Sequence, residues 1–311
     1  MSIPARAHFC WLGASLPWAY VFAILSAAEK SELKEVILHH TDALEDDARL
    51  HALKVWPRVR LSRIDPIACL TRAGHAVDAG DGLAAIYRRL DNPVIRTDVL
   101  RAAILYLQGG VYLDLDTVTT ATLRPLLGTP HFVRSSSSPA LWAHSIGLDL
   151  VRKVLCHVPR GWEKFRRVEK FYYRGITNSV MGAEPHSPLF ANYLHGMLAM
   201  PRERQEQLYA LGPDLLQDVV ARYSNGAVTI QEPQVFYPLP PEISEQWFRI
   251  SRNVRLDAVL STETRVVHWY ASVRTKSKVA LVHPRYVREH RDCQLYSALV
   301  CTCIGVLPDA T

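Results

Sequence analysis

Apolar and polar residues follow two alternating patterns in the first third of the chain. Short apolar runs typical of strands occur at residues 6–11, 35–40 and 58–64. Between them, residues 17–30 and 44–55 carry apolar side chains at helical spacing. Because strands that alternate with helices pair in parallel, this order predicts a βαβαβ unit and an α/β fold.

The next segment predicts a helix that leads into an acidic strand. Asn92 and Pro93 suit the N-cap and first turn of this helix, and Gly109 suits its C-terminal end. In the strand that follows, Asp114 and Asp116 are expected on one face, roughly 6 to 7 Å apart. Two carboxylates this close repel unless they share a proton or a cation, which favours a bound divalent metal.

The remainder of the chain mixes short helices and strands. Helices are expected near residues 146–156, 188–199, 202–210 and 213–223, and strands near 228–231 and 264–269. A loop at residues 135–138, which are all serine, is the clearest boundary between a first and a second half.

Composition limits the class of protein. The chain has 311 residues, 49% of them hydrophobic, which is enough for one large core or two fused lobes. No segment reaches the ~18 apolar residues of a membrane span, and the N-terminus lacks the apolar stretch of a signal peptide. The six cysteines have no metal-ligand spacing, so we expect free thiols and a cytoplasmic location.

Positive charge is concentrated in one part of the sequence. The net charge is +6, and residues 152–174 hold eight Lys or Arg against two Glu, together with five aromatic residues. Such a segment suits an anionic membrane surface, a nucleic-acid backbone or an acidic substrate, and equally a solvated helix face whose aromatic side packs inward.

Several motifs together resemble the glycosyltransferases that have a sugar-binding region with a DXD motif. The residues His8-Phe9-Cys10-Trp11-Leu12-Gly13 are similar to the opening strand of that family. The segment from Arg96 to Arg101, followed by Gly109-Gly110-Val111-Tyr112-Leu113-Asp114-Leu115-Asp116, is similar to its central core. Asn178, Gly212-Pro213 and Val267-His268-Trp269 are weaker matches further along the chain.

This resemblance implies a GT-A fold, which is a Rossmann-like nucleotide-binding sheet with additional helices. It divides the chain into a nucleotide-sugar-binding half at 1–134, an acceptor-side half of the same domain at 135–285 and a C-terminal tail at 286–311. It also implies a hexosyltransferase that uses Mn²⁺ or Mg²⁺ and retains the anomeric configuration. A metal on the donor's diphosphate neutralises the charge of the leaving group.

The resemblance also assigns residues to the site. Asp116 is expected to bind the metal, and Asp114 the metal, a metal-bound water or the donor ribose. Trp11, with Leu12 beside it, is expected to hold the base of the nucleotide, which favours UDP-sugars over GDP-sugars. His268 is a further candidate metal ligand, since imidazole accepts manganese, with a satisfied core histidine as the equal alternative.

The remaining candidate residues are expected to contact the nucleotide-sugar donor. Asp98 and Arg101 lie three residues apart on one helix face, where a surface ion pair is the simpler explanation and contact with the donor sugar is what the family implies. Asn178 joins them as a catalytic candidate, and Tyr112 is expected to shape the nucleotide pocket. The family's late Ser-Trp pair is absent here, so Lys276 is expected to contact the diphosphate instead.

Partners follow from the same features. We expect a nucleotide sugar and an acceptor that is a glycan, a lipid-linked glycan, a small molecule or a protein. The basic segment and the apolar tail suggest peripheral contact with an anionic membrane, whereas no nucleic acid is expected. Two alternatives remain open: a phosphohydrolase of the haloacid-dehalogenase type, whose signature fits Asp114 to Val118, and a non-enzymatic protein that binds nucleic acid or membrane.

Overall fold

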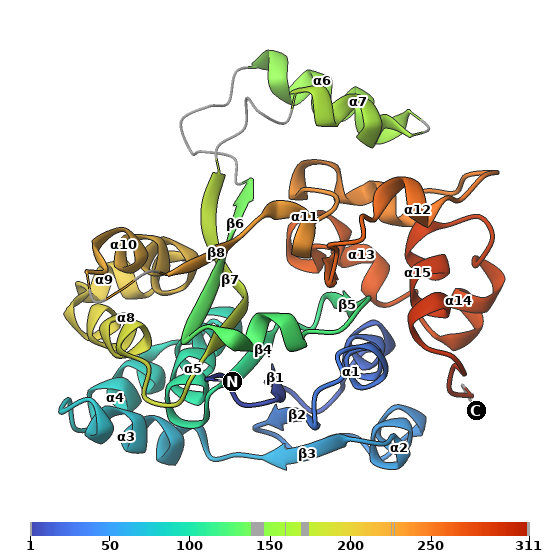
Figure 1. Ribbon diagram of the computed structural model, residues 1–311. Helices are drawn as coiled ribbons and strands as arrows, with labels where there is room; N and C mark the ends of the chain where they lie inside the picture. The colour runs from blue at the N-terminus through green and yellow to red at the C-terminus, as the bar shows by residue number, and fades with distance from the viewer. Residues whose placement is uncertain are drawn as a thin grey trace.

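The computed structural model of the protein describes residues 2–137, 146–158, 160–168, 174–224, 226 and 228–309. In this part of the chain a sheet of seven strands has the order β3-β2-β1-β4-β7-β6-β8, and β5 and β9 form a second sheet (Figure 1). The strands are β1 Arg6–Trp11, β2 Glu35–His40, β3 Val59–Arg63, β4 Gly110–Leu113, β5 Thr117–Thr119, β6 His131–Ser137, β7 Arg174–Ala183, β8 Thr229–Gln231 and β9 Val266–His268.

The first half of the large sheet is parallel. β1 pairs in parallel with β2 and β4, β2 pairs in parallel with β3, and only β7 runs antiparallel to its neighbours β4 and β6. The carboxyl ends of β1 and β4 therefore meet at one edge, where open α/β sheets bind their ligands. The predicted α/β fold, with a Rossmann-like sheet and additional helices, is confirmed.

Helices cover both faces of this sheet. The α-helices are α1 Trp18–Lys30, α2 Ala48–Val55, α3 Pro66–Ala76, α4 Gly82–Arg89, α5 Pro93–Gln108, α6 Ile146–His157, α7 Gly161–Val168, α8 Pro188–Ala199, α9 Arg202–Gln205, α10 Leu215–Arg222, α11 Pro233–Phe236, α12 Leu256–Val259, α13 Lys276–Val279, α14 Pro284–Glu289 and α15 Leu295–Cys303. Shorter 3₁₀ or π turns are η1 Arg124–Gly128, η3 Ala210–Asp214, η4 Pro241–Phe248 and η5 Ala271–Thr275.

The alternation of side chains along β4 divides the core in two. Val111 and Leu113 face a cluster that includes α1 and α15, whereas Tyr112 faces a cluster built from α3, α4, α5 and α8. Helix α5 begins as predicted, since the Asn92 side chain accepts the Val94 N–H at 2.9 Å. It ends at Gly109, whose φ of 62° suits glycine.

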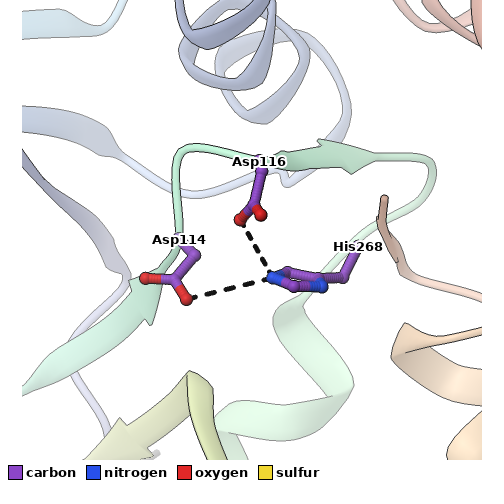
Figure 2. Close-up of side chains that lie close together, drawn as sticks. All are labelled: Asp114, Asp116 and His268. Atoms are coloured by element: carbon purple, nitrogen blue, oxygen red, sulfur yellow. Dashed lines mark ion pairs between the residues drawn. The ribbon is translucent and has the colours of Figure 1, made fainter. Parts of the chain in front are cut away.

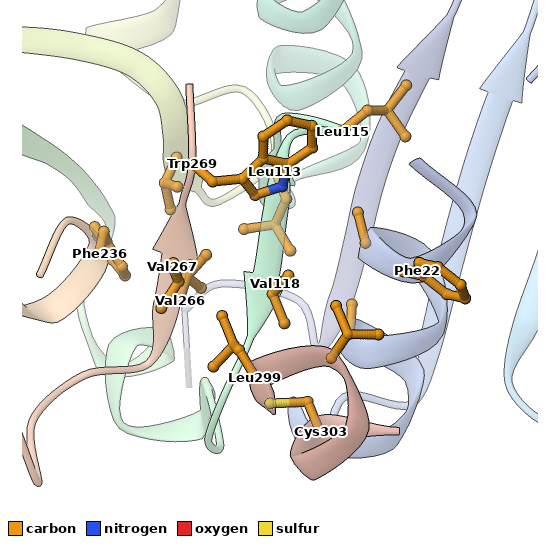
Figure 3. Close-up of a cluster of buried hydrophobic side chains, with 14 of the residues drawn as sticks. Phe22, Leu113, Leu115, Val118, Phe236, Val266, Val267, Trp269, Leu299 and Cys303 are labelled. Atoms are coloured by element: carbon orange, nitrogen blue, oxygen red, sulfur yellow. The ribbon is translucent and has the colours of Figure 1, made fainter. Parts of the chain in front are cut away.

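The C-terminal segment is part of this core. Leu299 and Cys303 of α15 pack with Val118 of β5 and Val267 of β9 (Figure 3). Tyr296 is also fully buried. The expectation that the apolar tail meets a membrane is therefore wrong for these side chains, because the core already covers them.

The serine segment is the second correction. Ser135, Ser136 and Ser137 lie in β6 and pair with β7, so they form strand rather than the predicted loop, and residue 138 lies outside the described residues. The domain boundaries placed at that loop stay a prediction. Residues 159 and 169–173 of the basic segment also lie outside the described residues. In the described part, no helix is long and apolar enough to cross a membrane.

Candidate functional site

The two aspartates lie in a turn and not on one strand, which corrects the prediction made from strand geometry. β4 ends at Leu113 and β5 begins at Thr117, so Asp114 and Asp116 occupy the connection between the two sheets. The Thr117 hydroxyl donates to the Asp114 carbonyl at 2.7 Å and closes this turn. The carboxylates still converge, but the turn brings them together.

His268 reaches the turn from far along the chain. β9 pairs antiparallel with β5, and this register places His268 opposite Thr117. Its Nε2 atom lies 2.9 Å from Asp116 Oδ1 and 3.9 Å from Asp114 Oδ2 (Figure 2). One ligand atom from each of the three residues lies within 4.8 Å of the others. The three metal-ligand candidates from the sequence are thus brought together.

The donor set suits a divalent cation. Two carboxylates and one imidazole are ligands that Mn²⁺ accepts, and the carboxylates also suit Mg²⁺. With Nε2 free to bind a metal, the proton of His268 would sit on Nδ1, which is buried and has no hydrogen-bond partner in the described part of the chain. These three side chains are the residues that would hold the ion.

The two carboxyl groups have opposite pKa shifts. Burial raises the pKa of Asp114 to about 6; the charge of Arg101 opposes this shift and that of Asp116 adds to it. Burial would also raise the pKa of Asp116, but the His268 ring and the Ala271 N–H outweigh it and hold that pKa below its ordinary value. The turn thus concentrates negative charge that a bound cation would stabilise.

A buried network supports Asp114 from the side of α5. Arg101 Nη1 lies 2.9 Å from Asp114 Oδ1 and also donates to the Asn178 carbonyl at 2.9 Å. Asp98 Oδ1 lies 3.5 Å from Arg101 Nη2 and accepts the Asn178 side-chain amide at 2.7 Å. Asp98 and Arg101 are 3% and 5% exposed, so their pair is not a surface ion pair. Most of their polar atoms are satisfied inside the protein, and the visible effect of the network is to fix Asp114.

Tyr112 holds the same carboxylate. Its hydroxyl donates to Asp114 Oδ1 at 3.0 Å, and the guanidinium of Arg101 lies 4.6 Å above its ring. The side chain is only 1% exposed, so Tyr112 reaches the site through Asp114. Its predicted contact with a nucleotide stays a prediction.

The remaining sequence candidates lie around this centre without contacting it directly. Trp11 ends β1 and packs edge-on against Tyr20, and its buried indole N–H has no hydrogen-bond partner within the part of the chain that the structure describes. Leu12 is half-buried against the α3–α5 side of the core. Lys276 is exposed at the start of α13, just after the turn that carries Ala271. Their roles stay predictions.

Sequence reasoning missed the aromatic wall beside His268. Tyr237 and Tyr270 stack at 5.4 Å, and the His268 ring meets both of them edge-on. The Tyr237 hydroxyl bonds to Thr177 and Ser179 of β7, the strand that also carries Asn178. The only signal was that Tyr270 is two residues after His268; nothing local marks Tyr237.

Comparison with known proteins shows that the acidic turn lies within a segment that matches a protein family. Residues 74–133 match the family described as glycosyltransferase sugar-binding region containing DXD motif. This segment includes α5 and the turn with Asp114 and Asp116. This segment of the chain therefore matches the sugar-binding region of the DXD glycosyltransferases, and the resemblance found in the sequence is confirmed.

Individual relatives are more distant or shorter matches. Inositol phosphoceramide mannosyltransferase 3 of Schizosaccharomyces pombe is 34% identical over 99 residues, which are 32% of this chain and 26% of that protein. The chain thus matches about a quarter of the length of that relative. Among solved structures, the PaToxG glycosyltransferase is 13% identical with a TM-score of 0.45, over 71% of this chain and 69% of its own. The galactosyltransferase LgtC is 14% identical with a TM-score of 0.43, over 98% and 97%.

Proposed function

We propose that this protein is a hexosyltransferase that moves a sugar from a nucleotide donor to an acceptor, with a divalent cation at Asp114, Asp116 and His268. The observation that carries the proposal is the convergence of these three ligands at the carboxyl end of β4, with both aspartates inside the DXD region. Mn²⁺ or Mg²⁺ bound there would supply positive charge beside the donor's diphosphate.

The chain's own residues prepare this site. Arg101 and Tyr112 both contact Asp114 Oδ1, so one carboxylate oxygen is fixed while Oδ2 faces His268. The Ala271 N–H fixes Asp116 Oδ2 in the same way and leaves Oδ1 toward the imidazole. Each aspartate thus has one oxygen held by the protein and one oxygen on the side of the metal position, an arrangement that reduces the reorganisation needed on binding.

The donor is proposed from the residues at the edge of the site. Trp11 at the end of β1 offers a flat ring for a base and supports UDP as the nucleotide. The mannosyltransferase named among the relatives supports transfer of a hexose, although it covers little of either chain. Lys276 is proposed to contact the diphosphate, and Asp98 with Asn178 to orient the donor sugar beside Asp114. Retention of configuration is carried over from the resemblance.

Acceptor and location are proposals from the sequence alone. We propose a cytoplasmic enzyme with peripheral membrane contact that acts on a glycan, a lipid-linked glycan, a small molecule or a protein. The phosphohydrolase alternative is not favoured, because in the described part of the chain His268 rather than a lysine pairs with the acidic turn. The alternative of a non-enzymatic protein that binds nucleic acid or membrane does not account for the cluster of Asp114, Asp116 and His268.

Hydrolysis of the donor in the absence of an acceptor tests the proposal. Purified protein is incubated with UDP-glucose, UDP-galactose, UDP-N-acetylglucosamine and GDP-mannose, each with Mn²⁺ and with chelator. We expect Mn²⁺-dependent release of UDP, and a fall of at least about 100-fold in Asp116→Asn, since the metal contributes several kcal/mol. Asp257→Asn, which changes an exposed aspartate paired with Arg255, is the matched control.

Three results would count against parts of the proposal. Full activity in Asp116→Asn would remove the metal-dependent mechanism. A preference for GDP-mannose would overturn the choice of UDP while leaving sugar transfer intact. Release of phosphate from a simple phosphate ester with Mg²⁺, without use of any nucleotide sugar, would support the phosphohydrolase instead.

A further inference from the structure

A cleft lies on a part of the protein that is separate from the candidate metal centre. It encloses about 390 Å³, counted with the solvent at its mouth, and its lining shares no residue with the acidic turn or with β9. The walls come from α7, the end of η4, residues 249–258 and the start of α15. α7 packs against η4, so these walls are held together by contacts of the described chain.

Arg249 is the residue that gives this cleft its chemical character. Its side chain is half-buried, and its Nε atom is buried with no hydrogen-bond partner among the described residues. Its Nη1 atom donates a long hydrogen bond of 3.4 Å to the Cys156 carbonyl. In the part of the chain that the structure describes, no carboxylate pairs with this guanidinium. A half-buried cation without a carboxylate partner is costly unless polar groups or an anion stabilise it. A ligand in the cleft would reach this guanidinium through its Nη atoms, because Nε is shielded from solvent.

Two further arginines stand at the mouth. Arg160 pairs with Glu163, and Arg255 pairs with Asp257 at 2.6 Å. Of the three arginines that line the cleft, Arg249 is the one that pairs with no carboxylate in the described part of the chain. The side chains of Arg160 and Arg255 are more than half exposed, so Arg249 is the most enclosed of the three.

The rest of the lining combines polar side chains with the apolar side chains of Trp162, Val254, Ala258 and Leu295. Gln246 is 3% exposed, and its amide nitrogen lies 2.8, 2.9 and 3.1 Å from the carbonyl oxygens of Leu155, Cys156 and Val158, which share its two N–H donors. The floor is thus fixed to the end of α6. Trp162 forms a buried wall, held by the guanidinium of Arg166 at 4.8 Å from its ring. Ser251 and Asn253 add a hydroxyl and an amide, which suit hydroxyl groups of a ligand.

We propose that this cleft binds the oxyanion group, phosphate or carboxylate, of a hydroxyl-rich ligand, with Arg249 as its main contact. An arginine fork matches both anions in geometry and charge. The binding claim does not depend on the proposed function. Only a role in anchoring the acceptor rests on that function, because the donor's diphosphate belongs beside Asp114 and Asp116.

Binding to the intact chain tests the claim by titration calorimetry. The probes are inorganic phosphate, glucose 6-phosphate and glucuronate, together with phosphatidylcholine vesicles that contain or lack phosphatidylinositol 4-phosphate. We expect at least one anionic probe to bind, and Arg249→Gln to weaken that binding on the order of 10- to 100-fold. Arg249→Lys should recover part of the affinity. Arg285→Gln, an exposed arginine that pairs with Glu289 on α14, should bind as the wild type does.

The outcomes distinguish a soluble ligand from a lipid headgroup, and they include results that would overturn the proposal. Binding of glucose 6-phosphate or glucuronate but not of vesicles assigns a soluble ligand, and the reverse assigns a lipid headgroup. The proposal is overturned if no probe binds the wild type, if Arg249→Gln binds equally well, or if Arg285→Gln loses as much. It is also overturned if UDP with Mn²⁺ competes with the probe, which would place the anion at the donor site. Asp116→Asn should leave probe binding unchanged, so failure of the proposed function is distinguished from failure here.

Discussion

Asp116 accepts a hydrogen bond of 2.7 Å from the backbone N–H of Ala271. The Trp269 N–H donates to the Asp116 carbonyl at 3.0 Å, so the acidic turn and the segment after His268 are joined twice. Whatever binds the carboxylates therefore also stabilises the turn that leads to Lys276.

The first prediction is that Mn²⁺ stabilises the fold through this junction. A ligand that binds only the folded state adds about 2.7 kcal/mol to the free energy of unfolding at 100 times its Kd. Urea unfolding with and without Mn²⁺ should show a gain of this order in the wild type and little in Asp116→Asn, which keeps an acceptor for Ala271 but loses the charge. Asp257→Asn should gain as much as the wild type, and an equal gain in Asp116→Asn would contradict the metal site.

The second prediction concerns Gly212 in η3, which lies directly on the catalytic candidates. A Cβ at this position would lie 2.7 Å from Asp98 Oδ2 and 3.0 Å from the Asn178 side-chain nitrogen. Gly212→Ala should therefore displace both side chains and reduce donor hydrolysis about 100-fold, as misplacements near 1 Å do. The control is Gly128→Ala, whose added Cβ meets no atom within 4 Å. Unchanged kinetics in Gly212→Ala would show that Asp98 and Asn178 do not need their present positions.

Local sequence patterns were sufficient to predict the elements of the first half of the sheet. β1 and β2 have the predicted bounds, and α5 lies between its predicted cap and stop, because apolar periodicity and capping residues are encoded within the segment itself. α3 was missed although the Asp65 side chain caps it by accepting two backbone N–H groups. β7 was missed because Thr177, Asn178 and Ser179 interrupt its apolar pattern where they face the site.

The sequence was sufficient to predict which residues form the candidate site, but not how they are arranged in space. The DXD spacing and the late His268 were visible, yet strand periodicity gave the wrong reason for the convergence of Asp114 and Asp116. That convergence depends on the pairing of β5 with β9, a contact between segments far apart in the sequence. The same holds for Tyr237, whose place beside His268 is set by tertiary packing alone.

The third prediction tests the charge balance around Arg101. Arg101→Met leaves Asp98 and Asp114 buried without their cation and should cost about 3 to 5 kcal/mol in the free energy of unfolding. Adding Asp98→Asn removes one of the two unpaired charges and should recover part of this loss in a double-mutant cycle. Arg101→Lys should lie between the wild type and Arg101→Met, since it keeps the charge but not the fork. Chemical denaturation measures the wild type, the two single variants of the cycle, the double variant and Arg101→Lys, and strictly additive losses would contradict the coupling of Arg101 with Asp98.

The fourth prediction is a loss of stability in mild acid caused by two buried histidines. His8 Nε2 lies 2.8 Å from the Gly109 carbonyl and therefore donates to it, so His8 Nδ1 accepts from His39 Nε2 at 2.9 Å. Both rings are neutral in this arrangement. Burial lowers the pKa of His8 to about 4, and burial together with the charge of His8 lowers the pKa of His39 to about 3.

The sign of the effect follows from these shifts. Unfolded histidine has a pKa of about 6.5, so between pH 6.5 and 4 the unfolded chain binds more protons than the folded one, and stability falls as the pH falls. Each histidine contributes a slope of about 1.4 kcal/mol per pH unit in this window. His39→Gln keeps a donor for His8 but cannot titrate, so urea unfolding from pH 7.5 to 4.5 should show a shallower slope than in the wild type. Since carboxyl groups contribute equally to both proteins, parallel curves would mean that His39 does not titrate as its burial requires.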